Sequence, residues 1–237
     1  MHAHTGFETR HDACDVLRTH RHDGAYAALV IDGSHVEASA DGPVDCVPGT
    51  LVLHPRWHAH GNRFGRLGAK VVNLDLDGDA VGDTLRVLRV HDAKDALAVF
   101  THAPHRLPEL IAACDAAPTP TPTLQPWQRT FLHELEHGEQ DIASLAQAAG
   151  VSLAHASRTF VKSHGMAPQL LRRELRCRRA LRLLVEGWPL VEIATISGFA
   201  DQAHLTRTLR AATGAPPSRL RRKIKSVQDA ALATALQ

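Results

Sequence analysis

Histidine is concentrated in the first 124 residues, which hold 12 of the chain's 17, and two groups have the spacing of metal ligands. His20 and His22 stand one residue apart, and so do His58 and His60. Neutral imidazole binds Zn, Ni, Cu and Fe, and three such ligands with an open position would also allow catalysis. His20, His22, His58 and His60 are therefore candidates for a metal site.

Three interpretations of these histidines stay open. They could line a pocket that binds a small molecule without metal, they could bind a transition metal that is or bridges an effector, or they could be structural. His2, His4 and His11 could scavenge metal, although chance surface histidines are the plainer explanation.

A second group of candidate functional residues lies in a short sequence that occurs twice, 49 residues apart. The two copies are Ser152-Leu-Ala-His-Ala-Ser-Arg-Thr-Phe160 and Asp201-Gln-Ala-His-Leu-Thr-Arg-Thr-Leu209. Each copy is followed by Gly and Pro at matching distances. Internal repetition of this kind points to duplicated structural units, and here each unit has the pattern of a helix-turn-helix.

The outward residues of the two repeated helices are candidates for contacts with DNA bases. Arg can grip guanine in bidentate fashion, Gln can pair with adenine, and the methyl groups of Ala and Thr suit thymine. The candidates are Ala154, His155, Ser157 and Arg158 in the first unit, and Gln202, Ala203, Thr206, Arg207 and Arg210 in the second.

Further basic residues crowd the helices around the repeat and are expected to contact phosphates, which position a protein without specifying sequence. They are Arg172, Arg173, Arg176, Arg178, Arg179 and Arg182 between the units, and Arg219, Arg221, Arg222, Lys223 and Lys225 after them. Arg158 and Arg207 occupy the same position in the two units, and one of them could be structural instead of contacting a base.

Charge is distributed unevenly along the chain, although the net formal charge is only +2. Residues 1–124 hold 11 Lys and Arg against 16 Asp and Glu, whereas residues 125–237 hold 16 against 9. A polyanion such as DNA would be attracted to the second half only. The four cysteines form no CxxC pair, which suits a reducing cytoplasm, and no apolar run approaches the ~18 residues of a membrane span.

Helices and strands must hold these functional residues in place. The sequence of the first half predicts strands. Short apolar runs over residues 16–90 alternate with turn signals such as Asp32-Gly33 and Pro48-Gly49, as in an antiparallel sandwich or small barrel. Residues 92–116 predict helices with Asp92 as a cap. Leu97, Phe100, Leu110 and Ile111 could anchor a dimer, although core packing explains them equally well. The Pro/Thr run at 117–124 predicts a linker between domain 1–116 and domain 125–237.

The second half predicts helices throughout. Helical periodicity begins at Pro126 and continues to about His137, and Ile142 to Ala149 form the first helix of the first unit. Ser152 caps the next helix, whose inward face is Leu153, Ala156 and Phe160. One long helix from Pro168 to about Glu186 joins the units, and Pro189 opens the second. The expected fold is α+β: a β-rich domain with helices, then an all-α domain.

These motifs resemble a known family. Residues 125–225 are similar to the DNA-binding domain of AraC/XylS-type transcriptional regulators, most specifically over Ile193 to Leu209 and Gly214 to Arg219. Leu209 stands where the family usually has Phe, and Ala154 and Ala203 are small for base-contacting positions. The resemblance implies a sequence-specific regulator that binds tandem sites in the major groove.

The first half resembles the two cupin motifs, and AraC-type regulators commonly carry a cupin-like sensor there. His20-x-His22 with Gly33 matches the first motif, and Pro48-Gly49 with His60 the second, but Tyr26 stands at the position of the cupin Glu. The resemblance implies a ligand pocket formed by His20, His22, Tyr26, His58 and His60. In this pocket His20, His22 and His60 are the candidate metal ligands, with His58 or water as a fourth, whereas the neutral phenol of Tyr26 is a poor ligand for a divalent ion.

The sequence thus predicts a cytoplasmic, ligand-responsive transcriptional regulator that is not an enzyme. Its expected partners are a double-stranded DNA operator, a small-molecule or metal effector, a second copy in a homodimer and, for an activator, RNA polymerase; no membrane is expected. The alternatives are a cupin-type metalloenzyme activity in the N-terminal domain and a non-specific nucleic-acid binder.

Overall fold

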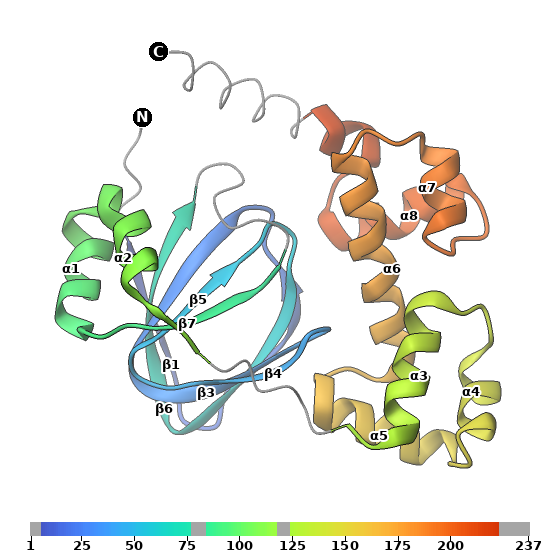
Figure 1. Cartoon of the computed structure of the whole chain (residues 1–237), viewed down its shortest axis with the longest axis horizontal. Helices are drawn as coiled ribbons and strands as arrows, with labels where there is room; N and C mark the ends of the chain where they lie inside the picture. The colour runs from blue at the N-terminus through green and yellow to red at the C-terminus, as the bar shows by residue number, and fades with distance from the viewer. Residues whose placement is uncertain (1–5, 77–83, 118–123, 223–237) are drawn as a thin grey trace. The chain divides into compact units, whose positions relative to one another are not determined.

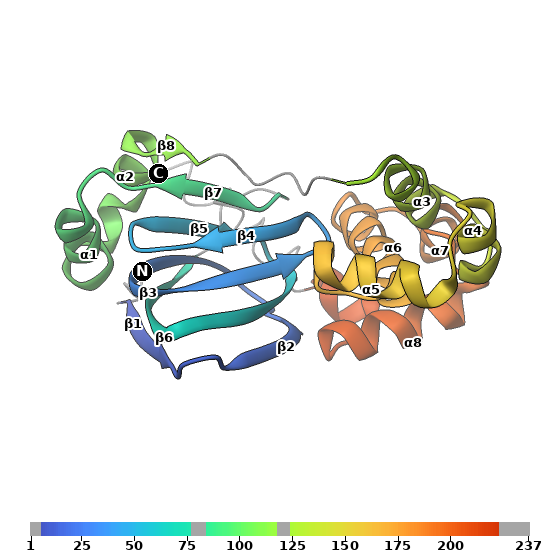
Figure 2. The ribbon, with the colours of Figure 1, turned by 90° about the horizontal axis from the view of Figure 1, so that it is seen from below.

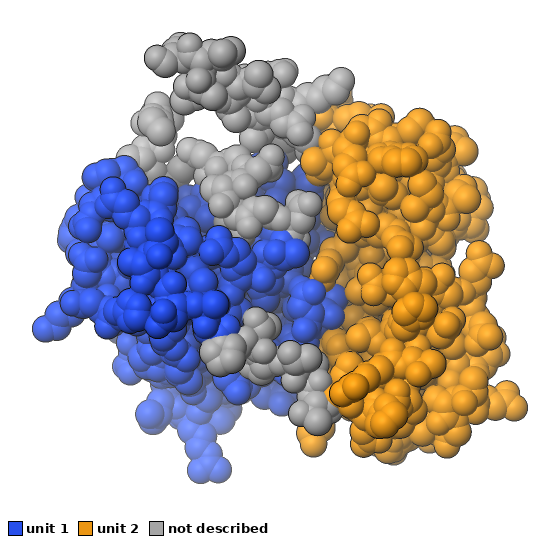
Figure 3. Space-filling view, viewed as in Figure 1, with its two compact units in different colours: residues 1–122 blue, residues 123–237 orange. Residues whose placement is uncertain are grey.

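The computed structural model describes residues 6–76, 84–117 and 124–222. The chain divides into two compact units, residues 1–122 and residues 123–237 (Figure 3). The first is an antiparallel sheet with short helices, and the second is helical (Figure 1). The predicted fold class, a β-rich domain followed by an all-α domain, is confirmed. His2 and His4, most of the predicted linker and the segment after Arg222 lie outside the described residues.

The first unit is built on one sheet with the strand order β1-β6-β3-β5-β7-β8, in which β2 also pairs with β6 and β4 with β3. Figure 2 shows how the long strands β3 and β6 curve to give a barrel-like shape. The strands are β1 Phe7–His11, β2 Val16–Arg21, β3 Ala25–Ser39, β4 Gly42–Cys46, β5 Thr50–His54, β6 Ala59–Leu76, β7 Arg86–Arg89 and β8 Asp115–Ala116.

Two of these strands lie outside the range 16–90 that the sequence predicted. β1 pairs with the second half of β6, from Phe7 opposite Asn73 to His11 opposite Ala69. Its sequence is mostly polar, so it lacks the apolar alternation that indicates a strand. β8 is a two-residue strand on β7, at a position predicted to be helical. Ala117, the first residue of the predicted linker, is buried and donates its N–H to the Val87 carbonyl.

A glycine pair sets the bend of the sheet. The pairing of β3 with β6 shifts register around Gly33, where φ is +69°. A Cβ on Gly33 would lie 2.1 Å from the Gly68 carbonyl oxygen, so only glycine fits this close approach. Beyond the bend, β3 pairs with β4 and the first half of β6, which brings Ser39 opposite His60.

The sheet buries both of its faces. Ala27 and Leu29 pack with Phe100 in a cluster that includes the helices, whereas Ala28 and Val30 belong to a second cluster. The helices are α1 Ala93–His102, a short 3-10 helix Pro104–Arg106 and α2 Leu107–Ala113. Asp92 caps α1 as predicted. Leu97, Leu110 and Ile111 pack against the Phe100 cluster, so core packing accounts for all four proposed dimer anchors.

The second unit has the predicted helices, in the predicted order. They are α3 Pro126–His137, α4 Ile142–Ala148, α5 Leu153–His164, α6 Pro168–Val185, α7 Leu190–Ile196 and α8 Gln202–Thr213, followed by a helical segment at 217–222. Pro189 is the N-cap of α7 and not its first helical residue, because its ψ of 141° is extended. Leu153 is 48% exposed and not inward, because it occupies the open first turn of α5.

Candidate nucleic-acid interface and histidine cluster

The two repeated helices, α5 and α8, have the same kinds of capping residue at both ends. The Ser152 side chain accepts a hydrogen bond from the His155 N–H at 3.1 Å, and Asp201 accepts one from His204 at 2.6 Å. The helices end at Gly165 and Gly214, which have φ of 69° and 73°. Each helix therefore starts at a side-chain cap and stops at a left-handed glycine, so the repeat in sequence is a repeat in structure.

The first of these helices presents the outward face that the sequence predicted. Ala154, His155 and Arg158 are exposed and Ser157 is partly buried, while Ala156 and Phe160 form the buried inner stripe. The His155 ring lies 5.8 Å from that of Trp127 on α3, so this histidine also packs at the helix start. The groups left for base contacts are mainly Arg158 and small side chains.

The second helix exposes more hydrogen-bonding groups. Gln202, Ala203, Arg207 and Arg210 are exposed and Thr206 is partly buried, above the buried pair Leu205 and Leu209. The neighbouring His204 instead packs within the turn. Its ring contacts Phe199 with a centroid distance of 5.3 Å, and its Nδ1 accepts the Ala200 N–H at 3.5 Å. The structure thus brings all the second-unit candidates to one open helix.

Several arginines expected at phosphates bind the protein itself. Arg176 on α6 donates to the Gly138 carbonyl at the end of α3, and Arg179 donates to the Ile196 carbonyl and His137 Nδ1 at 3.4 and 3.0 Å. These carbonyls lie at helix ends, which lack intrahelical donors. Arg173 and Arg182 remain exposed on α6. The connecting helix therefore braces both units, a role that the charge pattern alone did not indicate.

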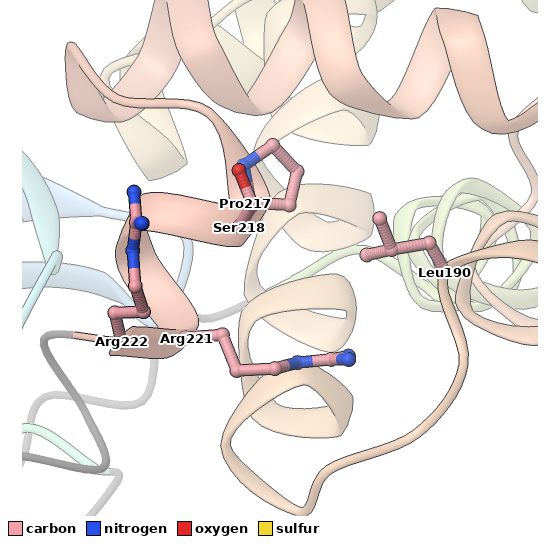
Figure 4. Close-up of a pocket in the computed structure, with 5 residues that line it drawn as sticks. All are labelled: Leu190, Pro217, Ser218, Arg221 and Arg222. Atoms are coloured by element: carbon pink, nitrogen blue, oxygen red, sulfur yellow. The ribbon is translucent and has the colours of Figure 1, made fainter.

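Arg221 is likewise engaged within the protein. Its guanidinium donates to the Trp188 carbonyl ahead of α7, and its Nε is buried. It lines a pocket together with Leu190, Pro217, Ser218 and Arg222, in which the two arginines leave the backbone in different directions (Figure 4). Arg222 is exposed and is the better phosphate candidate. Lys223 and Lys225 lie outside the described residues.

The predicted metal ligands of the first unit lie together. His20 faces His60 across the β2–β6 pairing, and their ring centroids are 4.5 Å apart. The His22 ring lies 5.1 Å from His20 and 5.5 Å from His60. One ligand atom from each residue lies within 4.8 Å of the others. We call His20, His22 and His60 the outer set, because His22 is exposed and His20 only partly buried.

Tyr26 touches this set as predicted. Its hydroxyl lies 3.2 Å from His60 Nε2, and its ring lies 4.7 Å from that of His22. Burial raises the pKa of Tyr26 well above its ordinary value, so it stays a neutral phenol. Tyr26 can therefore orient His60 through a hydrogen bond, whereas it is a poor direct ligand.

Two residues that the sequence did not single out complete the cluster. Glu37 and His54 are 2% and 1% exposed, and His54 Nε2–H donates to both Glu37 oxygens at 3.0 and 2.9 Å. Burial raises the pKa of Glu37, but His54, His60 and His58 outweigh it and hold the pKa below its ordinary value. Every second residue of this stretch, His35, Glu37 and Ser39, is buried, and this alternation was the one signal in the sequence. Because all three side chains are polar, nothing in the sequence favoured placing that face of the strand in the interior.

A second group of potential ligands is centred on this carboxylate. Glu37, His58 and His60 each offer a ligand atom within 4.8 Å of the others, and all three are buried. We call them the inner set. His60 belongs to both sets. His11, by contrast, stacks on Phe64 at 4.1 Å, and His35 beside it is buried, which lowers its pKa to about 4.

Comparison with known proteins identifies the second unit. Residues 145–223 match the family model described as a helix-turn-helix domain. The HTH-type transcriptional regulator GlxA of Rhizobium meliloti (strain 1021) is 34% identical over 84 residues, which cover 35% of this chain and 26% of that protein. YbfI, an HTH-type regulator of Bacillus subtilis (strain 168), is 31% identical over 75 residues, covering 32% and 27%. The matched part thus spans about a quarter of each relative.

A solved structure of fatty-acid-bound ToxT from Vibrio cholerae aligns over 93% of this chain and 97% of that one, with 11% identity and a TM-score of 0.41.

Two helix-turn-helix units with exposed second helices define a DNA-binding protein of the helix-turn-helix class. Residues 145–223 of the second unit thus match a helix-turn-helix domain, and the motif from Ile193 to Arg219 resembles that of AraC-type regulators. Within the described residues, no helix combines the length and apolar character needed to cross a membrane.

Proposed function

We propose that the chain is an effector-responsive transcriptional regulator that acts in the cytoplasm and binds a tandem operator sequence. The observation that carries this proposal is the pair of exposed helices, α5 and α8, which share a frame and differ in their outward residues. A repeated frame presents two base-contacting surfaces, and different side chains on them select two different half-sites.

The length of α6 supports simultaneous contact with both half-sites. Its 18 residues correspond to about 27 Å of helix. With a helix-turn-helix unit packed near each end, this roughly suits two successive major grooves, which lie about 34 Å apart. The basic excess of the second half adds a sequence-independent attraction to DNA.

The N-terminal unit is proposed to be a cupin-like sensor. In the outer set His22 is exposed and His20 is partly buried, so a small molecule or a Zn, Ni, Cu or Fe ion could reach them. An effector acts by binding one arrangement of the regulator more tightly than another, which shifts the population that binds the operator. A homodimer and, for an activator, a contact with RNA polymerase are part of this proposal.

The DNA-binding part is tested by selecting sites from random duplex DNA with the full chain. The expected result is a bipartite motif with half-sites about 10–10.5 base pairs apart, centre to centre. Arg158→Ala should relax one half-site and leave the other unchanged. Arg66→Ala, an exposed arginine of the sheet, serves as the control. Enrichment of no motif would instead support the non-specific binder.

The sensing part is tested on the selected operator with the chelator-treated protein, alone and with added Zn²⁺, Ni²⁺ or Cu²⁺. A metal effector should change operator affinity or transcription in vitro, and His20→Ala should remove the change. Equal affinity and equal transcription with and without each ion would exclude metal sensing and leave the small-molecule alternative.

A further inference from the structure

Four buried side chains from three strands and one turn meet around His60. Glu37 comes from β3, His54 from β5 and His60 from β6, while His58 precedes β6. All four are at most 5% exposed. Ring centroids of His54, His58 and His60 lie 4.9 to 5.9 Å apart. A buried group of one carboxylate and three imidazoles is costly unless its charges and hydrogen bonds are satisfied.

We propose that Glu37, His58 and His60 bind a divalent transition-metal ion at a buried site distinct from the accessible pair His20 and His22. Their ligand atoms already lie within 4.8 Å of one another. Two imidazoles and one carboxylate are a common donor set for Zn²⁺ and for Fe²⁺, Co²⁺ or Ni²⁺. The inner set supplies a negative charge, whereas the outer set consists of imidazoles alone.

The hydrogen bonds of His60 support a ligand role. Its Nε2 lies 3.2 Å from the Tyr26 hydroxyl, while its Nδ1 is buried without a hydrogen-bond partner among the described residues. If Nδ1 carries the proton, a buried donor is left unsatisfied. If Nε2 carries it and donates to Tyr26, the Nδ1 lone pair is free to bind a cation. Tyr26 then fixes the tautomer and orientation of a metal ligand, as a hydrogen-bonding neighbour of a ligating histidine usually does.

His54 acts in this site as a positioning residue. Its Nε2–H holds both Glu37 oxygens at 3.0 and 2.9 Å, and its ring stacks on Tyr26 with a centroid distance of 4.2 Å. Carboxylates that bind metals are themselves commonly held by hydrogen bonds of this kind. His54 therefore orients the ligand Glu37, and Tyr26 orients the ligand His60.

The test is metal binding by the full, untagged chain carrying His2→Ala and His4→Ala, so that the N-terminal histidines do not contribute. Chelator-treated protein is titrated with Co²⁺ by calorimetry and visible absorption, and with Zn²⁺ in competition. Glu37→Gln and His58→Asn should each weaken binding more than the ~10–100-fold typical of changes to outer-shell groups. His11→Asn, a partly buried histidine outside both sets, should bind as the parent does.

His20→Ala separates the two sets. The inner ion should remain in this variant, with X-ray absorption showing two imidazoles and one carboxylate. Unchanged affinity in Glu37→Gln and His58→Asn, or loss of the ion in His20→Ala alone, would overturn the proposal. So would the absence of Co²⁺ and Zn²⁺ binding.

Two further measurements keep the outcome interpretable. The metal-free thermal midpoint shows whether each variant folds, and if Glu37→Gln does not, His58→Asn decides. Zn²⁺ should raise the midpoint of the parent and not that of His58→Asn, because an ion that binds only the native state stabilises it. Operator binding by the metal-free parent is measured separately, so failure of the metal site leaves the proposed DNA-binding function standing.

Discussion

At the scale of single residues, similar arginines have different roles because their surroundings differ. Arg207 is exposed on α8, whereas Arg179 is bonded to α3 and α7 and Arg221 to the Trp188 carbonyl. A base-contacting residue needs a free guanidinium, so exposure separates Arg207 from the bracing arginines. The roles of His54 and Glu37 likewise follow from their burial and their mutual contact, and not from their residue types.

Arg207→Ala should reduce discrimination at one or two base pairs of the half-site bound by α8. A bidentate contact with guanine contributes about 1–3 kcal/mol of specificity, which alanine removes. The measurement is competition binding with every single-base variant of the selected operator. A uniform loss over all variants would mean that Arg207 contacts phosphate.

Arg221→Ala should lower the stability of the second unit, because it leaves the Trp188 carbonyl without its donor; the expected loss is about 0.5–1.5 kcal/mol. Its neighbour Arg222 is exposed, so Arg222→Ala should leave stability unchanged. If Arg222 contacts a phosphate, Arg222→Ala changes how DNA binding depends on salt. The slope of the logarithm of the binding constant against the logarithm of the salt concentration becomes shallower by about 0.9. Urea unfolding and salt titrations of the two variants check both expectations, and an identical pair of results would contradict them.

At the scale of elements, the recognition helices depend on their caps. The Asp201 carboxylate accepts the His204 N–H at the start of α8 and also lies at the positive end of the helix dipole.

Asp201→Ala should therefore destabilise the second unit by about 1 kcal/mol, within the 0.5–2 kcal/mol typical of N-caps. Asp201→Asn should recover most of this loss, because its side-chain oxygen can accept the same bond. Thermal unfolding compares the variants, with Ser152→Ala as the equivalent change on α5. Equal midpoints for Asp201→Ala and the parent would show that α8 does not need the cap.

Helices and apolar strands were predictable from sequence where local signals set them, whereas the buried polar cluster of the sheet was not. The caps Asp92, Ser152 and Asp201 act within four residues, so their positions follow from the chain itself. The contact between Glu37 and His54 depends on the bend at Gly33, which brings together residues 17 positions apart. The outer set was predictable because its spacing resembled known motifs; the inner set needed the register of β3 against β6.

At the scale of the whole molecule, the chain separates its chemistry by unit. An acidic excess and most histidines lie in the sheet unit, and a basic excess lies in the helical unit. Within the helical unit, α6 joins the two helix-turn-helix pairs as one unbroken helix.

Inserting about five base pairs between the half-sites, half a helical turn, should abolish simultaneous contact, and about ten should also fail because α6 cannot lengthen. Affinity on both spacer variants should fall to that of a single half-site, measured by gel shift with the intact operator as reference. Recovery at ten base pairs would show that the two units move apart, contrary to a rigid α6.

The matching caps and glycine ends of α5 and α8 also bear on how such a regulator changes its targets. Because the frame of each recognition helix is set by Ser152 with Gly165, or by Asp201 with Gly214, the exposed residues can vary without altering the fold. If the protein binds the proposed tandem operator, a substitution on one helix alters one half-site while the other still holds the protein on the DNA. Specificity can therefore drift one half-site at a time through intermediates that still bind.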